Sequence, residues 1–179
     1  KSRFEKIKEK VIYFNTSQGS HILRLYANNS YGNVNARNVT FIVNLTRFTI
    51  FYNEYNDSTK GSSTNFLQYP YEDLQSLSNI ILENTLSGKI LFNQAINLTD
   101  DANITDNTLD LDAYTNISFN RIEINSTALP NFNNTATLWF YNLTYTNPKI
   151  LRDGIACPLT ICTIESYSAG TLKFNVTGF

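Results

Sequence analysis

The sequence predicts an all-β protein, and three observations support this class. Apolar and polar residues alternate with period two over most of the chain, as they do in half-buried strands. The alternating segments are rich in Val, Ile, Thr, Tyr and Phe, which favour strands. Clusters of Asn, Asp, Gly and Pro separate them, as turns do. With 179 residues, of which 42% are hydrophobic and 13% aromatic, the chain can bury a core.

Nine segments are predicted strands, and turn signals stand between most of them. In chain order they are residues 21–28, 38–44, 47–52, 88–93, 107–112, 116–125, 136–146, 160–167 and 171–176. One short helix is expected over residues 70–81. Pro70 stands at its start, and the acidic Glu72 and Asp73 follow in its first turn, which is a start signal for a helix.

A break in composition predicts how the chain is divided. Residues 56–65, NDSTKGSSTN, are polar, mostly small and without periodicity, as linkers and long loops are. We therefore expect a partial β module over residues 1–54, a linker or long loop over 55–69, and a second β domain over 70–179.

Residues 19–43, GSHILRLYANNSYGNVNARNVTFIV, resemble the last two strands of Ig-like modules in bacterial and archaeal surface proteins. The matching residues are Leu25, Ala27, Asn29, Gly32, Asn33, Val39, Thr40, Phe41 and Val43. The C-terminal half resembles Asn- and Thr-rich archaeal cell-surface proteins in composition. This resemblance implies an Ig-like β-sandwich architecture and a role as a spacer or adhesive unit on a cell surface. A β-solenoid remains the alternative for residues 80–179.

The polar residues of this chain are unusual for a soluble protein. Charged residues make up 16%, compared with roughly 25% in ordinary domains, whereas the chain has 25 Asn, 14 Ser and 20 Thr. A chain with so few charges needs another hydrophilic coat to stay dissolved.

Asn-x-Ser/Thr triplets, the acceptors of N-glycosylation (sequons), would supply that coat. Chance placement gives roughly five such triplets, and the chain has more than twice that number. They begin at Asn15, Asn28, Asn38, Asn44, Asn56, Asn97, Asn103, Asn116, Asn125, Asn133, Asn142 and Asn175. In triplets such as Asn142-Leu143-Thr144, a strand would turn the apolar middle residue inward and the acceptor outward. We expect N-linked glycans and an extracellular or cell-surface location; composition alone is the alternative origin of the triplets.

The two cysteines and the histidine indicate which disulfide, zinc or catalytic sites the chain could form. Cys157 and Cys162, in ACPLTIC, are predicted to form a disulfide in an exported chain. A structural zinc site needs four Cys or His ligands, and His21 is the chain's single histidine. Because no nucleophile motif accompanies His21, we expect no enzyme and no required cofactor.

An acidic stretch over residues 100–112 is the candidate metal site. It concentrates oxygen ligands of the kind that calcium prefers, from Asp100, Asp101, Asn103, Asp106, Asp110 and Asp112. The spacing departs from an EF-hand, because Asp106 stands where that loop has Gly and Asp112 where it has Glu. A calcium site and a solvated turn built on Asp and Asn side chains are both open interpretations.

The net charge of −1 gives no electrostatic reason to expect a nucleic-acid partner. No apolar run approaches the ~20 residues that span a bilayer. The chain begins at Lys1 and has no Met, so we expect a processed piece of a longer precursor.

An incomplete sandwich module exposes sheet edges, which are templates for strand addition. We therefore expect a homopolymer, assembled by strand addition or head-to-tail contacts into an extracellular filament or surface layer. Residues 10–15 or 172–179 are the candidate exchanged segments. The alternative is a carbohydrate-binding or adhesive module, which would carry an aromatic platform on its surface.

Overall fold

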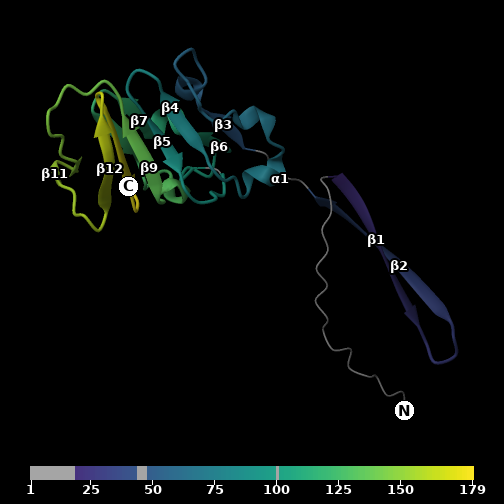
Figure 1. Ribbon diagram of the computed structural model, residues 1–179. Coiled ribbons are helices and arrows are strands. Elements are labelled where there is room, and N and C mark those ends of the chain that lie inside the picture. Colours follow the sequence, from purple (N-terminus) through teal and green to yellow (C-terminus); the bar gives the residue numbers. More distant parts are fainter. Residues whose placement is uncertain (1–18, 44–47, 100) are drawn as a thin grey trace. The chain divides into compact units, whose positions relative to one another are not determined.

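The computed structural model describes residues 19–43, 48–99 and 101–179. The chain divides into two compact units, Lys1–Thr46 and Arg47–Phe179, each described here by itself (Figure 1). Strands dominate both units and the helices are short, which confirms the all-β class. No helix in the described ranges is both long and apolar enough to cross a membrane.

The first unit contains a β-hairpin. Its strands are β1 (Gly19–Asn28) and β2 (Val34–Val43), which pair in register over their full length. Asn29 organises the turn, because its side-chain oxygen accepts hydrogen bonds of 3.0 Å from the N–H groups of Tyr31 and Asn33. Gly32 has a φ of +81°, which glycine adopts without strain.

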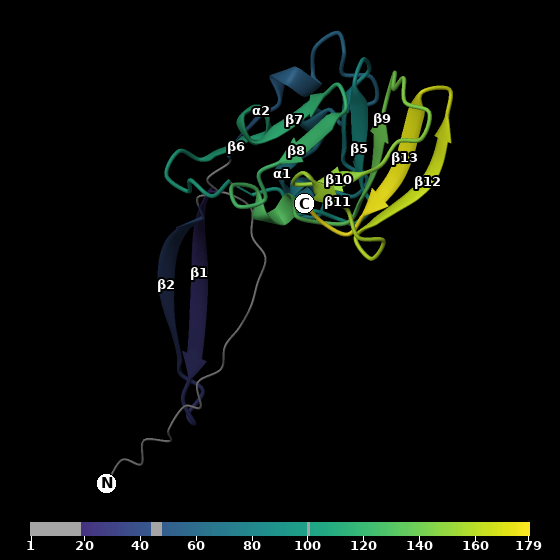
Figure 2. The same ribbon diagram turned by 90° about the vertical axis from the view of Figure 1, so that its left-hand side faces the viewer.

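A five-stranded antiparallel sheet is the centre of the second unit. Its order is β12-β13-β9-β5-β4, and Figure 2 shows β9, β13 and β12 side by side. The strands are β4 (Ile81–Asn84), β5 (Gly88–Phe92), β9 (Ala136–Phe140), β12 (Cys162–Ser168) and β13 (Thr171–Val176). Even-numbered residues of β4, β5, β9 and β13, such as Leu82, Ile90 and Phe174, are buried, so period-two alternation makes one face of this sheet the core.

Smaller sheets complete the unit. The hairpin of β7 (Thr115–Ser118) and β8 (Arg121–Ile124) contacts β4 and β5 through β7. The strands β10 (Leu151–Arg152) and β11 (Ile155–Ala156) form another pair. β3 (Thr49–Phe51) pairs in parallel with β6 (Thr108–Asp110). This arrangement is sandwich-like. Residues 80–179 do not form the β-solenoid that was the alternative.

The helices are single turns. They are η1 (Asn53–Tyr55), η2 (Phe66–Gln68), α1 (Tyr71–Leu74), α2 (Leu111–Tyr114) and η3 (Pro130–Phe132). The helix expected over residues 70–81 stops at Leu74, because Leu77 already forms a β-bridge with Ile96 and β4 begins at Ile81.

The boundary between the units lies earlier than residues 54 and 55, where the sequence placed it. Residues 55–69, expected as a linker or long loop, belong to the second unit, and Tyr55 and Phe66 are each 2% exposed. The polar residues there make local turns, in which Asp57 accepts from the N–H of Thr59 and Asn65 from the N–H of Leu67. Polarity in this stretch therefore reflects turns within a folded unit.

Three predicted strands are interrupted. β9 ends at Phe140, well before residue 146, and Asn142 has a φ of +57°; Asn142 and Thr144 therefore do not share a strand face. Residues 116–125 fold back near Asn120, where φ is +60°. The strand expected over 107–112 ends at Asp110, whose side chain accepts from the N–H of Ala113 and caps α2.

Candidate functional site

A groove lies over the apolar face of the five-stranded sheet, and we call it the β8 groove. Its volume is about 700 Å³. Its floor consists of apolar side chains from two neighbouring strands: Leu138 and Phe140 on β9, and Leu172, Phe174 and Val176 on β13. It is bordered by Asn120, by the β8 residues 121–124 and by residues 147–154, which carry β10. Part of the core face of the sheet is therefore reachable from outside.

The open edge of β8 borders this groove. Five consecutive residues, 120–124, line it. Successive side chains of a strand point to opposite faces, so a cavity on one face would touch only every second residue. A cavity that touches consecutive residues therefore lies along the edge of the strand. Within the described part of the chain, β8 pairs only with β7. The backbone groups on its other edge are therefore in position to pair with an added strand.

Four of the five charged residues that line the groove form ion pairs, and the fifth is Lys149. A guanidinium nitrogen of Arg121 lies 2.5 Å from a carboxylate oxygen of Glu123, and Arg152 lies 3.9 Å from Asp153. The side chains of Arg121 and Glu123 are 66% and 45% exposed, so the pair lies at the surface while the floor carries no charge. The groove thus suits an apolar, uncharged occupant.

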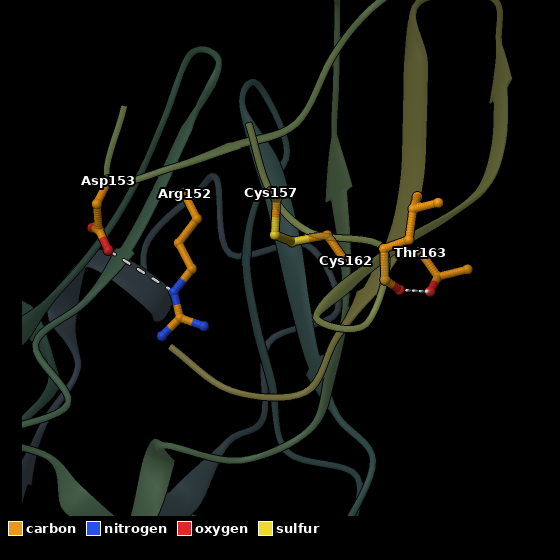
Figure 3. The surroundings of a disulfide bond; sticks show 6 residues. Arg152, Asp153, Cys157, Cys162 and Thr163 are labelled. Carbon is orange, nitrogen blue, oxygen red and sulfur yellow. Dashed lines mark hydrogen bonds and ion pairs between the residues drawn. A yellow bond between two sulfur atoms is a disulfide. The ribbon is translucent and has the colours of Figure 1, made fainter. Parts of the chain in front are cut away.

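The predicted disulfide between Cys157 and Cys162 is confirmed, with their Cα atoms 5.9 Å apart (Figure 3). The carbonyl of Pro158 accepts hydrogen bonds of 2.9 Å from the N–H groups of Ile161 and Cys162, which form a tight turn inside the ring. Cys162 is the first residue of β12 and Cys157 directly follows β11. The bond therefore ties the segment that borders the groove to the edge of the sheet.

The C-terminal segment 172–179 is part of the fold, which corrects its expected role as an exchanged segment. β13 lies between β12 and β9, and Leu172 and Phe174 are each 2% exposed. Phe179 packs on Phe92 with 6.1 Å between ring centroids, and its N–H donates to the side chain of Asn133 over 2.9 Å. Removing this segment would delete an inner strand of the sheet.

Both outer edges of the five-stranded sheet are protected in ways that hinder strand addition. Along β4, Ser63 accepts from the N–H of Glu83 over 2.8 Å, and the N–H of Thr64 donates to the carbonyl of Ile81 over 2.9 Å. Along β12, the pairing register shifts between Ile164 and Ser166, and such bulges disrupt pairing.

Glu83 fastens the loop before β4 to the sheet. Its side chain is among the buried charged groups, at 8% exposed, and accepts from the N–H and hydroxyl of Ser62 and, over 2.8 Å, from the hydroxyl of Tyr141. Burial raises the pKa of Glu83, but the hydrogen bonds from Ser62 and Tyr141 and the charge of Lys89 outweigh it and hold the pKa below its ordinary value. Burial and the Glu83 carboxylate raise the pKa of Tyr141.

A close approach of backbone makes this arrangement possible. Gly61 has a φ of +51°, and a Cβ atom there would lie 2.3 Å from a carboxylate oxygen of Glu83. A larger residue would push the loop away from the carboxylate.

The opposite face of the sheet carries the chain's single Trp. Trp139 lies between Lys89 and Lys173 on the neighbouring strands, whose ammonium nitrogens are 4.3 Å and 5.4 Å from the ring centroid. A sugar could stack on this ring only by displacing the lysines. This geometry does not favour an open aromatic platform of the kind that a carbohydrate-binding module uses.

The sequons are distributed over the surface. Asn15 and Asn44 lie outside the described residues, and nine of the other ten acceptor asparagines are exposed: Asn28, Asn38, Asn56, Asn97, Asn103, Asn116, Asn125, Asn133 and Asn142. Asn175 differs because it is half-buried on β13, an inner strand of the sheet, where its amide nitrogen donates to Glu165 over 2.5 Å and its oxygen accepts from Thr137 over 2.7 Å. Glycan occupancy at each site stays a prediction.

The acceptors are absent from the β8 groove and from one side of the hairpin, although the side that carries them exposes Ile22, Tyr26, Val34 and Ile42 by 64–75%. None of the ten described sequon asparagines lines the β8 groove. In the hairpin, directly paired residues point to the same side, and Asn28 and Asn38 both belong to the side of the even-numbered residues. The odd-numbered side of β1 and β2, which we call the sequon-free face, exposes Leu23, Leu25 and Val39 by 38–49%.

The acidic stretch is occupied by local hydrogen bonds. Asp100 lies outside the described residues. Asp101 accepts from the N–H of Asn103, Asp106 from that of Thr108, Asp110 from that of Ala113, and Asp112 from those of Asn53 and Glu54. Among the described residues no group of three or more His, Cys, Asp or Glu is placed to hold a metal ion. These contacts are those of turns and helix caps, and calcium binding stays an untested prediction.

The chain was also compared with known proteins. No protein-family model matches the chain, and no curated protein matches it. A solved structure with some likeness is the C-terminal domain of the nuclear pore complex component NUP116 from Candida glabrata. The likeness has a TM-score of 0.42 and 17% sequence identity, over 63% of this chain and 82% of that chain, and it is too remote to carry an argument.

Proposed function

We propose that this protein is a structural subunit of an extracellular, N-glycosylated filament or surface layer, assembled through contacts between copies of the chain. The observation that supports the proposal is the distribution of the acceptor asparagines over the surface. The sequons cover exposed positions on both units, yet they are absent from the β8 groove and from the sequon-free face of the hairpin.

The hairpin supports contacts between copies. An isolated two-stranded hairpin is marginally stable in water, and in the described part of the first unit β1 and β2 pair only with each other. Their exposed side chains include Leu25 at 49% and Val39 at 47%. Contiguous exposed apolar residues mark interaction surfaces, and without a glycan this one is open to a protein partner.

Glycans would also explain how the rest of the surface stays dissolved. With 16% charged residues, the chain has few ionised groups to keep copies apart. Sugars on exposed asparagines supply that hydration and restrict association to the surfaces that lack them.

The test moves a glycan from one side of the hairpin to the other in the full glycosylated chain. Leu25→Asn with Ala27→Thr creates a sequon on the sequon-free face. The matched control, Tyr26→Asn with Asn28→Thr, shifts the existing acceptor by two residues on the opposite side. Intact mass before and after deglycosylation confirms that each sugar is present, and sedimentation with electron microscopy measures assembly.

We expect the unaltered chain and the control to form polymers and the first variant to remain monomeric. An unaltered chain that carries no glycan or stays monomeric would refute the proposal, and normal polymers from the first variant would refute the role of the sequon-free face.

A further inference from the structure

We propose that the β8 groove receives residues 10–15 of a second copy, KVIYFN, as an added strand along the open edge of β8. This inference rests on the proposed function, because it identifies the contact that joins one subunit to the next. Adding a strand to an exposed sheet edge is an established mode of peptide recognition, in which backbone hydrogen bonds give affinity and pockets for alternate side chains give specificity.

The lengths agree. The four residues of β8 border the groove, which corresponds to about 13 Å of strand, and the four apolar residues 11–14 of the segment span the same length. A strand beside β8 would lie over the apolar floor, in which Phe140 is half-buried and Phe174 is buried. It would also lie next to residues 147–154, the segment that the disulfide holds against the sheet.

The apolar character of the segment also agrees with that of the groove floor. Residues 11–14 are four consecutive apolar residues without a charge. The floor of the groove is apolar, and Arg121 at its border is already paired with Glu123. An uncharged apolar segment can therefore enter without separating an ion pair or burying a lone charge, which would be costly.

The sequon at Asn15 fixes the orientation. In a strand, Val11, Tyr13 and Asn15 share one side, and Ile12 and Phe14 share the other. A glycan on Asn15 has to point to solvent, so Ile12 and Phe14 face the floor.

We assign the segment to a second copy. A segment of one subunit that binds a different surface of the next makes a heterologous contact. Heterologous contacts that do not close a ring produce open filaments. The other candidate for exchange, residues 172–179, already supplies an inner strand of the sheet.

The first experiment compares two double variants of the full glycosylated chain. Ile12→Ser with Phe14→Ser removes the side chains that face the floor, and Val11→Ser with Tyr13→Ser is the matched control on the other side. Each buried apolar side chain contributes enough for at least tenfold in affinity, so we expect association about a hundredfold weaker in the first variant and nearly unchanged in the control.

The second experiment mixes two variants that are each unable to polymerise. One is Ile12→Ser with Phe14→Ser. The other carries a new sequon at the border of the groove, through Lys149→Asn with Leu151→Thr; both positions are exposed and line the groove. Mixing should give a heterodimer and nothing longer, because only one functional segment and one open groove remain. Circular dichroism of each variant checks that it is folded.

The outcomes separate the two proposals. Polymers that form equally well with Ile12→Ser and Phe14→Ser overturn this inference and leave the proposed function standing. A mixture that stays monomeric shows that the segment occupies the groove of its own chain or lies elsewhere, and also overturns it. An unaltered chain that never associates refutes the inference and the proposed function together.

Discussion

The two units of this protein treat their apolar residues in opposite ways. In the hairpin of β1 and β2, alternating apolar residues remain on the surface, and Ile22 and Tyr26 are 66% and 64% exposed. In the unit Arg47–Phe179, the same alternation buries one face of a sheet, and Ile90 and Phe92 are completely inaccessible. A period-two pattern therefore predicts a strand in both units, but whether the strand is covered depends on residues far away in the sequence.

The difference also separates two roles for apolar surface. Burial within one unit stabilises that unit's own fold. Exposed apolar residues contribute nothing to stability until something covers them, so they are available for contacts between copies. The acceptor asparagines are absent from the groove and from one face of the hairpin, but Asn28 and Asn38 share the other face with the exposed Ile22 and Tyr26.

Truncating a core residue should have the largest effect on stability. Phe92 packs on Phe132 with 5.2 Å between ring centroids, and Phe92→Ala should lower the free energy of unfolding by about 3–5 kcal/mol because it leaves a cavity. Tyr26→Ala in the hairpin should change it by no more than about 0.5 kcal/mol. Chemical denaturation of both variants measures the contrast, and equal effects would contradict the division between the units.

Neutralising Glu83 should cause the second largest loss in the free energy of unfolding. Glu83→Gln weakens the charged hydrogen bonds from Ser62 and Tyr141 and should cost roughly 2–3 kcal/mol, whereas Tyr141→Phe removes one bond and should cost about 1 kcal/mol.

The cost of Glu83→Gln should depend on pH. Because the folded pKa of Glu83 lies below its ordinary value of 4.5, its stabilising contribution is present above pH 4.5 and is lost as the pH falls through the folded pKa. Denaturation at pH 7 and at pH 3 should show the difference between wild type and Glu83→Gln shrinking at the lower pH. A difference that is constant or grows in acid would contradict this account of Glu83.

Removing the disulfide should have a smaller effect. The bond joins residues five apart, and closing so short a loop stabilises the folded state by about 2 kcal/mol. Cys157→Ser with Cys162→Ser should therefore reduce the unfolding free energy by that amount while the circular dichroism spectrum is retained. Loss of the native spectrum would show that the bond is required for the sheet to form.

The smallest effect on stability is expected at the acceptor asparagines, where the readout is the sugar itself. Asn38 is exposed, so we expect it to be glycosylated, whereas Asn175 uses both ends of its amide within the sheet. Glycopeptide mass spectrometry should find sugar at Asn38 and little or none at Asn175. Full occupancy at Asn175 would mean that modification precedes formation of β13.

Local features of the fold could be predicted from the sequence. The turn at Asn29 and Gly32, the strand over residues 171–176 and the Cys157–Cys162 bond all depend on residues close together in the chain. Their determinants are turn chemistry, alternation and spacing, which a sequence displays directly.

Other features depend on partners that the sequence does not place. The parallel pairing of β3 with β6 joins Thr49 to Thr108, and nothing local indicates it. Residues 55–69 have the polarity of a linker, yet the buried Tyr55 and Phe66 hold them in the second unit. The β8 groove could not be foreseen, because its floor and borders come from four separate stretches of the chain.

Hydrogen exchange of the polymer against its dissociated subunits tests most directly whether the glycan-free apolar surfaces join the copies. We expect the polymer to slow exchange at the backbone amides of residues 19–43 and 120–124 and to leave those of β12 unchanged. Exchange that slows only along β12, or that is identical in polymer and subunit over both expected stretches, would contradict the account.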